Sequence, residues 1–248
     1  MEPCSALHTC VVVDANGLPK ISTTNKTLGK FTPDWTGGIS NTFSYRSLSL
    51  SFLIDASVGG SIFSNTNKTG KYTGVLANTL SGRDAEHGGL WYYTAAMGNN
   101  VRLPESPSYS VSSDGLYYAQ VNGQSTRVYQ DGIMVEGVTE SGSKNEEVVS
   151  AEKYYHRIYS IAEANVYDAS YVKLREVALS YRLPRLWTQK LHLQEASVTL
   201  TGRNLWTIYK SVPNIDPESA LTTGNAQGVE AYSLPTTRSF GVNLSVKF

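Results

Sequence analysis

The stretch Arg238–Phe248, RSFGVNLSVKF, alternates apolar residues with polar or very small ones. Its apolar members are Phe240, Val242, Leu244, Val246 and Phe248. Successive side chains of a β-strand point to opposite faces, so the stretch predicts a strand with one apolar and one polar face. Two environments suit such a strand: the half-buried sheet of a soluble sandwich, and the wall of an outer-membrane barrel, which is apolar toward lipid and polar toward its lumen.

Four other stretches also predict strands, at residues 39–45, 47–56, 169–184 and 196–209. The alternation is clear in LSLSFLIDA, where Leu53 is the one exception, and in VALSYRLP, which Pro184 ends. The links after Tyr45 and Pro184 are short, whereas those after Asp55 and Tyr209 are long. Alternating short and long links are typical of outer-membrane barrels, so we expect an all-β fold of antiparallel strands.

The longest link, at about residues 58–165, is rich in Gly, Ser, Asn and Tyr and has no sustained periodicity. A stretch of this length without regular structure is unusual in a compact soluble domain and counts against a sandwich. Within it we predict short helices at residues 72–80 and 150–164, the second capped by Ser150. Residues 11–22, VVVDANGLPKIS, predict a short hairpin with its turn at Asn16 and Gly17.

The composition excludes several classes of function. Lys plus Arg equals Asp plus Glu at 21 each, so no net field favours nucleic acid. No apolar run is long enough for a spanning helix, and the first residues lack the basic and apolar parts of a signal peptide. Cys4 and Cys10 lie near His8 without a second pair to complete a zinc site. We find no catalytic motif, and we expect no enzyme, metal or cofactor.

Five motifs in order carry a family resemblance: TPDWTGGISNTFSYRSLSLSFLIDASVGG (32–60), YDASYVKLREVALSYRLP (167–184), LTGRNLW (200–206), NIDPES (214–219) and PTTRSFGVNLSVKF (235–248). Together they resemble the C-terminal end of SusC/RagA-type TonB-dependent outer-membrane transporters. The resemblance runs from about Gly29 to Phe248. NIDPES by itself is typical of a turn, because Pro217 presets the backbone and Asp216 caps it.

The resemblance implies a transmembrane barrel of about 22 strands with an N-terminal plug, of which this chain would supply about five strands. Residues 1–36 would be a loop and hairpin region before the first barrel strand. Residues 37–248 would be the partial barrel, with one very long extracellular loop at about 58–165. The sequence contains no recognisable plug or TonB box, so we expect a fragment or a truncated reading frame.

The resemblance also implies a location in the outer membrane of a Gram-negative bacterium and import of a glycan or peptide. The implied partners are a SusD-like surface lipoprotein, the TonB complex and outer-membrane lipid. It further implies that Phe248 acts as an assembly signal, since the final strand of such barrels favours a terminal Phe. The alternative from another class is a soluble secreted β-sandwich that binds carbohydrate.

Candidate ligand-binding residues gather in one part of the long link: Arg83, Asp84, Trp91, Tyr92 and Tyr93. Flat aromatic rings beside hydrogen-bonding groups suit the apolar faces and hydroxyl rims of sugars. The alternative is that these rings pack the link against its neighbours. The position of the apolar side chains distinguishes a barrel from a sandwich. In a barrel, one exposed surface of a single sheet carries Leu50, Phe52, Leu179 and Leu244, whereas a sandwich buries them between two sheets.

Overall fold

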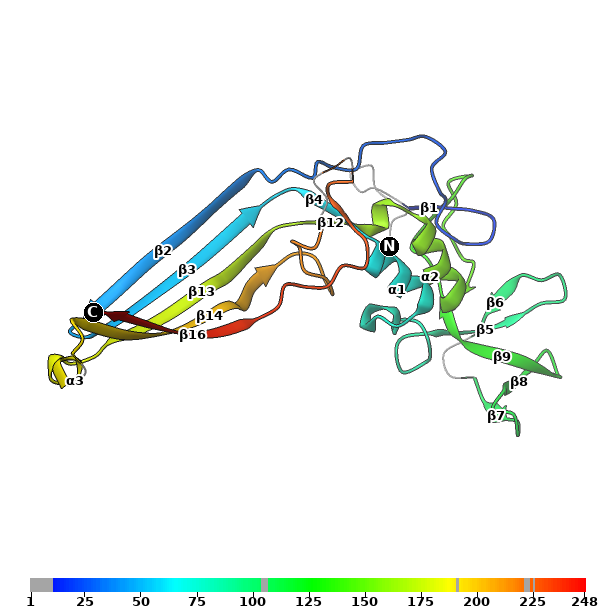
Figure 1. The fold of residues 1–248 in the computed structure, drawn as a ribbon. Coiled ribbons are helices and arrows are strands. Elements are labelled where there is room, and N and C mark those ends of the chain that lie inside the picture. The colour runs from blue at the N-terminus through cyan, green and yellow to red at the C-terminus, as the bar shows by residue number, and fades with distance from the viewer. Residues whose placement is uncertain (1–10, 104–106, 191, 221–223, 225) are drawn as a thin grey trace. The chain divides into compact units, whose positions relative to one another are not determined.

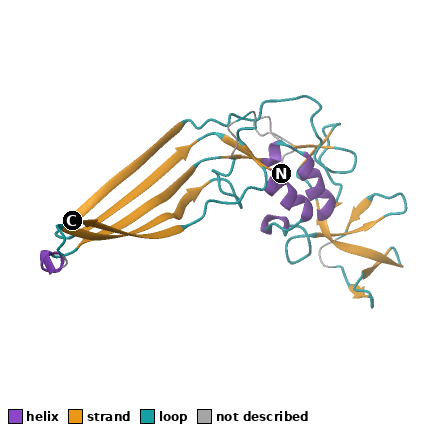
Figure 2. Cartoon of the chain, viewed as in Figure 1, coloured by secondary structure: helices purple, strands orange, loops and turns teal. Residues whose placement is uncertain are grey.

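The structure is a computed structural model that describes residues 11–103, 107–190, 192–220, 224 and 226–248. Cys4, Cys10 and His8 lie outside the described residues. The chain divides into two compact units: unit 1 comprises residues 1–27 and 67–165, and unit 2 comprises residues 28–66 and 166–248. Figure 2 shows that strands predominate and that the helices are few and short.

Unit 2 is built on a five-stranded antiparallel sheet in the order β16-β14-β13-β3-β2 (Figure 1). Its strands are β2 (Trp35–Tyr45), β3 (Leu48–Val58), β13 (Tyr171–Arg182), β14 (Glu195–Lys210) and β16 (Ser239–Lys247). These are the five predicted strands, and their antiparallel pairing is confirmed. Arg46 takes a positive φ of 54° in the two-residue turn between β2 and β3. The short helix α3 (Arg185–Lys190) links β13 to β14.

A β-bulge at Arg175 changes which side chains of β13 share a face. Leu174 pairs with Ile54 and Glu176 pairs with Leu53, so Arg175 is an extra residue on β13. Without the extra residue, Leu174 and Val177 would point to opposite faces, because they are three positions apart in the strand. With it, both residues lie on the same face of the sheet.

A second, three-stranded sheet of unit 2 has the order β12-β4-β15. Its strands are β4 (Ser61–Ser64), β12 (Val166–Asp168) and β15 (Val229–Glu230). Ile62 packs with Val212 and Ile215 in a small buried core. The fully buried Glu230 carboxylate accepts hydrogen bonds from the Ser64 hydroxyl at 2.8 Å and the Thr66 hydroxyl at 2.6 Å. These bonds tie β15 to the end of β4.

Unit 1 contains a six-stranded sheet in the order β6-β5-β9-β8-β7, with β11 also paired to β9. Its strands are β5 (Leu90–Thr94), β6 (Asn100–Arg102), β7 (Tyr109–Val111), β8 (Tyr117–Val121), β9 (Gln124–Ile133) and β11 (Val149–Ser150). Two further strands, β1 (Val11–Val13) and β10 (Gly137–Thr139), pair in parallel. The strands within residues 58–165 were not predicted, because we expected this link to contain only short helices. Most are three to five residues long, too short to establish a visible period.

The helices confirm one prediction and correct another. The helix α2 (Ala151–Ser160) begins where predicted, and the Ser150 hydroxyl accepts a hydrogen bond from the Lys153 amide at 3.3 Å. The helix expected at residues 72–80 is wrong: α1 (Asn65–Thr73) ends before it, and only the 3₁₀ turn η1 (Ala77–Thr79) lies inside it. Gly74, with φ of +69°, ends α1. A second 3₁₀ turn, η2 (Glu163–Asn165), follows α2.

The predicted hairpin near residue 11 is present as a tight turn. The Lys20 amide donates to the Val12 carbonyl at 2.8 Å, and Gly17 takes a φ of +75°. Among the described residues, no helix combines the length and the apolar character needed to cross a bilayer.

Candidate functional site

The apolar face of the five-stranded sheet is exposed over its whole width. One row of directly paired residues crosses all five strands: Phe43, Leu50, Leu179, Leu200 and Val242. These side chains are 38 to 73% exposed, with Leu179 at the lower limit and Val242 at the upper. A sandwich would bury them against a second sheet. The barrel interpretation predicts that Leu50, Phe52, Leu179 and Leu244 share one exposed face of the sheet. All four lie on this face.

The opposite face of the same sheet is polar. Ser180 and Thr199 pair through their hydroxyls at 2.5 Å, and Arg203 Nε donates to Glu176 Oε2 at 2.9 Å. The two faces therefore differ in the way that lipid and an aqueous lumen require.

Five charged residues form an ion-pair network on the polar face, where a loop of unit 2 meets β13. Lys173 Nζ lies 2.6 Å from Asp216 Oδ1 and 2.5 Å from Glu218 Oε2. Arg175 pairs with Asp55 of β3 and also with Glu218. The Lys173 side chain is 3% exposed and that of Asp216 is 8% exposed, so this pair is nearly removed from water.

The surroundings of Asp216 keep its carboxylate charged. Burial alone would raise the pKa of Asp216, but hydrogen bonds from Lys173, the Thr236 hydroxyl and two backbone amides outweigh it and lower the pKa to about 2. The Glu218 amide donates to Asp216 Oδ1 at 3.1 Å, and the Ser219 amide donates to the Asp216 carbonyl at 3.0 Å. NIDPES is therefore a turn, as predicted, and it also supplies two carboxylates to the network.

The predicted aromatic residues lie on β5 of unit 1. Trp91 is 8% exposed and stacks on Tyr109 with ring centroids 4.9 Å apart. Tyr93 is partly buried and packs against the same cluster. Tyr92 lies on the opposite face, is 5% exposed and stacks on Tyr129 at 5.1 Å. Its hydroxyl donates to Asp131 at 3.2 Å. Trp91 and Tyr92 thus pack their rings largely against neighbouring residues. This is the arrangement expected if the rings pack the long link and do not bind a ligand.

Arg83 and Asp84 lie in the loop before β5. The Arg83 guanidinium donates to the Thr79 hydroxyl at 2.9 Å and to the Gly74 carbonyl. Asp84 Oδ1 is 2.7 Å from His87 Nδ1, and the hydrogen bonds from His87 lower the pKa of Asp84. The described residues contain no group of three or more His, Cys, Asp or Glu side chains placed to hold a metal ion.

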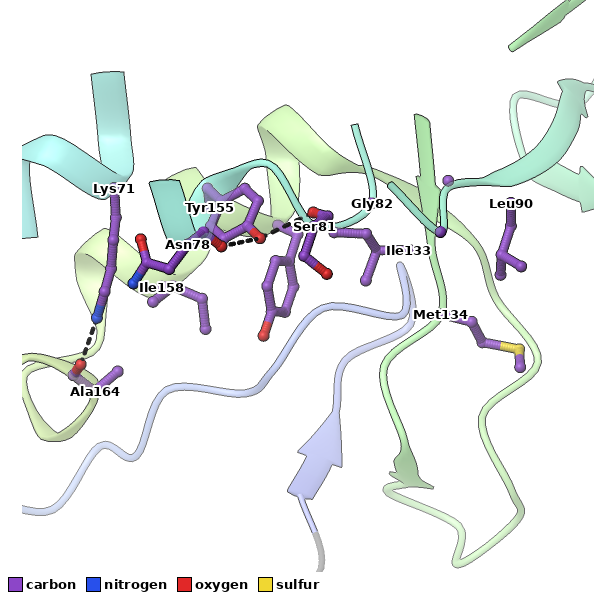
Figure 3. Close-up of a pocket in the computed structure, with 13 residues that line it drawn as sticks. Lys71, Asn78, Ser81, Gly82, Leu90, Ile133, Met134, Tyr155, Ile158 and Ala164 are labelled. Atoms are coloured by element: carbon purple, nitrogen blue, oxygen red, sulfur yellow. Dashed lines mark hydrogen bonds between the residues drawn. The ribbon is translucent and has the colours of Figure 1, made fainter. Parts of the chain in front are cut away.

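Two hollows of unit 1 share Lys71 and Tyr155 in their linings. The larger hollow has a volume of about 600 Å³, and its lining includes Asn78, Ser81, Leu90, Ile133, Met134 and Tyr155 (Figure 3). The smaller hollow has a volume of about 460 Å³, and its lining includes Lys71, Tyr72, Arg83, Asp131, Glu152 and Tyr155. Of the five predicted residues, Arg83 lines the smaller hollow directly and Tyr92 contacts it through Asp131. Tyr155 and Glu152 were missed, because nothing in the sequence distinguishes them from other polar residues of a short helix.

The role predicted for Phe248 stays a prediction. The residue follows β16 directly, and 83% of its surface is exposed. Its alternation with Val246 and Leu244 continues the apolar pattern of that strand.

Comparison with known proteins supports the resemblance noted in the sequence. No family model matches the chain. The chain is 25% identical to the TonB-dependent receptor P3 of Formosa agariphila over 242 residues. The aligned region covers 95% of this chain and 18% of that protein. The chain therefore resembles part of a TonB-dependent receptor, and it spans about 18% of that relative's length.

Solved structures of the RagAB peptide importer are also similar. The 'open-open' state matches with a TM-score of 0.43 and 18% identity over 88% of this chain and 17% of that chain. The 'closed-closed' state matches with a TM-score of 0.46 and 17% identity over 93% of this chain and 19% of that chain.

Proposed function

We propose that this chain forms part of the wall of an outer-membrane, TonB-dependent nutrient importer. The exposed apolar row across β2, β3, β13, β14 and β16 carries the proposal, because lipid is the environment that stabilises such a face. The strands are 9 to 16 residues long, and a tilted strand needs roughly 9–11 residues to cross the hydrocarbon layer. Similarity to a TonB-dependent receptor supports the same assignment.

The partners in this proposal follow from the class of transporter. A SusD-like surface lipoprotein would capture a glycan or peptide, and the TonB complex would supply energy across the periplasm. Residues 67–165 of unit 1 would be extracellular, since they lie within the one long connection between β3 and β13. We keep Arg83, Asp84, Trp91, Tyr92 and Tyr93 as proposed ligand-contacting residues. Because Trp91 and Tyr92 are buried, Arg83, Asp84 and Tyr93 have the more accessible positions of the five.

Substituting neighbouring residues of β14 tests the membrane-facing assignment. Leu200 lies on the apolar face, and Thr201 lies on the polar face. In the protein as produced in cells, we expect Leu200→Arg to destabilise the barrel by about 2–4 kcal/mol, since an arginine near the bilayer midplane must be taken out of water. Thr201→Arg should have a much smaller effect. Heat-modifiable mobility on gels measures the assembled fraction, and equal loss of assembly in both variants would contradict the proposal.

A further inference from the structure

The short helix α3, between β13 and β14, has apolar side chains on its outward side. Thr188 is 3% exposed and faces the rest of unit 2, whereas Leu186 and Trp187 are 74 and 59% exposed. At about 100° per residue, Leu186 and Lys190 lie on the side of the helix opposite Thr188. Trp187 is adjacent to Lys190 on the same surface. The outward side of α3 therefore combines apolar, aromatic and basic groups.

The apolar face of the five-stranded sheet continues to the end that holds α3. A second row of paired residues crosses the sheet there, two positions beyond the row of Leu179: Tyr45, Leu48, Tyr181, Val198 and Leu244. Tyr45 and Tyr181 are 71 and 43% exposed. Tyrosine is enriched at the boundary between hydrocarbon and headgroups. Arg185 begins α3 four positions after Tyr181, which places the helix at the level of the headgroups.

The short links of the sheet meet at this end. The Arg182 amide donates to the Ser47 carbonyl at 2.8 Å, which joins the link of α3 to the β2–β3 turn. The Gln194 amide donates to the Lys247 carbonyl at 2.8 Å, so the end of β16 lies here too (Figure 1). Short turns of outer-membrane barrels face the periplasm. In the proposed importer, the headgroups beside α3 are those of the periplasmic leaflet.

The charges on the β13–β14 link are unbalanced. Between residues 182 and 195 the sequence contains Arg185 and Lys190, which are cationic at neutral pH, and no Asp or Glu. Glu195 is already paired with Arg182 at 2.8 Å. Within the part of the chain that the structure describes, neither Arg185 nor Lys190 has an ion-pair partner. Uncompensated basic groups at a membrane surface favour anionic over zwitterionic headgroups.

We propose that α3 is a binding site for an anionic glycerophospholipid of the bilayer. Leu186 and Trp187 insert between the lipid molecules below the headgroups. Arg185 and Lys190 bind the phosphate and the rest of the anionic headgroup. Two observations identify lipid as the occupant: the apolar face of the sheet continues to α3, and the link carries an uncompensated positive charge. The inference rests on the proposed function, because it requires that apolar face to lie in lipid.

Fluorescence quenching in vesicles tests the site. The protein, produced in cells and purified in detergent, is reconstituted in phosphatidylcholine with increasing fractions of brominated phosphatidylglycerol, which is anionic, or of brominated phosphatidylcholine, which is zwitterionic. Subtracting the signal of Trp187→Phe isolates the fluorescence of Trp187. We expect phosphatidylglycerol to bind beside Trp187 with a roughly five-fold or higher relative affinity. Combining Arg185→Gln with Lys190→Gln should bring the two lipids within about two-fold of each other.

Arg203→Gln is the matched control, because Arg203 is an exposed cation of unit 2 on the polar face of the sheet. This variant should keep the preference for phosphatidylglycerol. Three results would overturn the inference: equal quenching of Trp187 by both lipids, quenching by neither, or a preference that survives the loss of both α3 cations. Quenching by neither lipid would place α3 in water or against a protein. Assembly of the Leu200 and Thr201 variants, measured separately, distinguishes failure of this site from failure of the importer proposal.

Discussion

Lys173 is a buried charge whose partners come from a distant part of the chain. Its ammonium group lies between Asp216 and Glu218, at 2.6 and 2.5 Å. Removing one partner of a buried ion pair leaves the remaining charge without compensation, which costs more than the pair itself contributes. The network therefore fixes the loop after β14 on the polar face of β13.

Replacing Lys173 tests this role. We expect Lys173→Met to lower the free energy of unfolding by about 3–5 kcal/mol, because Asp216 loses its principal cationic partner while it stays buried. Arg203→Met is the control: Arg203 pairs with Glu176 on the same face, but their side chains are 65 and 38% exposed. Its cost should be at most about 1 kcal/mol. Urea unfolding of the folded protein in detergent measures both values, and similar small changes would show that the network does not anchor the loop.

Acid should weaken the same contact. The pKa of Asp216 is lowered to about 2 in the folded protein, whereas an unperturbed Asp titrates at about 4. The charged carboxylate therefore stabilises the folded state at neutral pH, and this contribution is lost as the pH falls from about 4 to 2.

Hydrogen exchange at the Glu218 and Thr236 amides measures this effect, since both donate to Asp216. Corrected for intrinsic exchange rates, their protection should fall over that pH range. Asp216→Asn should remove the pH dependence. Protection that is equally pH-dependent in the Asn variant would assign the change to another group.

Some residue-level features could be predicted from the sequence, and others could not. The turn in NIDPES was predictable because its cause is local: Pro217 and Asp216 act on adjacent backbone. The ion pairs of Asp216 and Glu218 were not, because Lys173 lies 43 and 45 residues away. The alternation of polar and apolar residues cannot predict a contact between residues so far apart in the sequence.

At the scale of elements, long alternating strands were predictable and short strands were not. β16 alternates throughout, and β3 does so with one exception, so hydrophobic period alone identifies them. In β13 the bulge at Arg175 shifts the pattern by one position, and only the half after Glu176 reads as regular. In unit 1, β6, β7 and β10 have three residues each, and pairing rather than pattern defines them.

The helices show the same division. Ser150 begins α2 through a side-chain bond to the Lys153 amide, and that local cause was visible in the sequence. The position of Tyr155 was not predictable, because its hydroxyl bonds to the carbonyls of Asn78 and Ser81, more than 70 residues earlier. Of the candidate ligand residues, Arg83 could be placed beside a hollow only once α2 was positioned within unit 1.

At the scale of the whole molecule, the account rests on one sheet with two different faces. Within the described residues, the five-stranded sheet begins at β2 and ends at β16, and each of these strands has one partner. An unpaired edge is not tolerated in lipid, because its backbone groups lack hydrogen bonds. The importer proposal therefore requires further strands to pair with β2 and β16.

The most direct test of the membrane-facing assignment compares neighbouring positions of β13. Leu179 belongs to the apolar row, and Ala178 lies on the polar face beside Ser51 and Thr201. Each is replaced singly by cysteine, in protein whose Cys4 and Cys10 are serine, and carries a fluorescent label in lipid vesicles. We predict that brominated lipid tails quench the label at position 179 and that aqueous iodide quenches the label at position 178. Quenching at position 179 by iodide, without quenching by brominated lipid, would contradict the account.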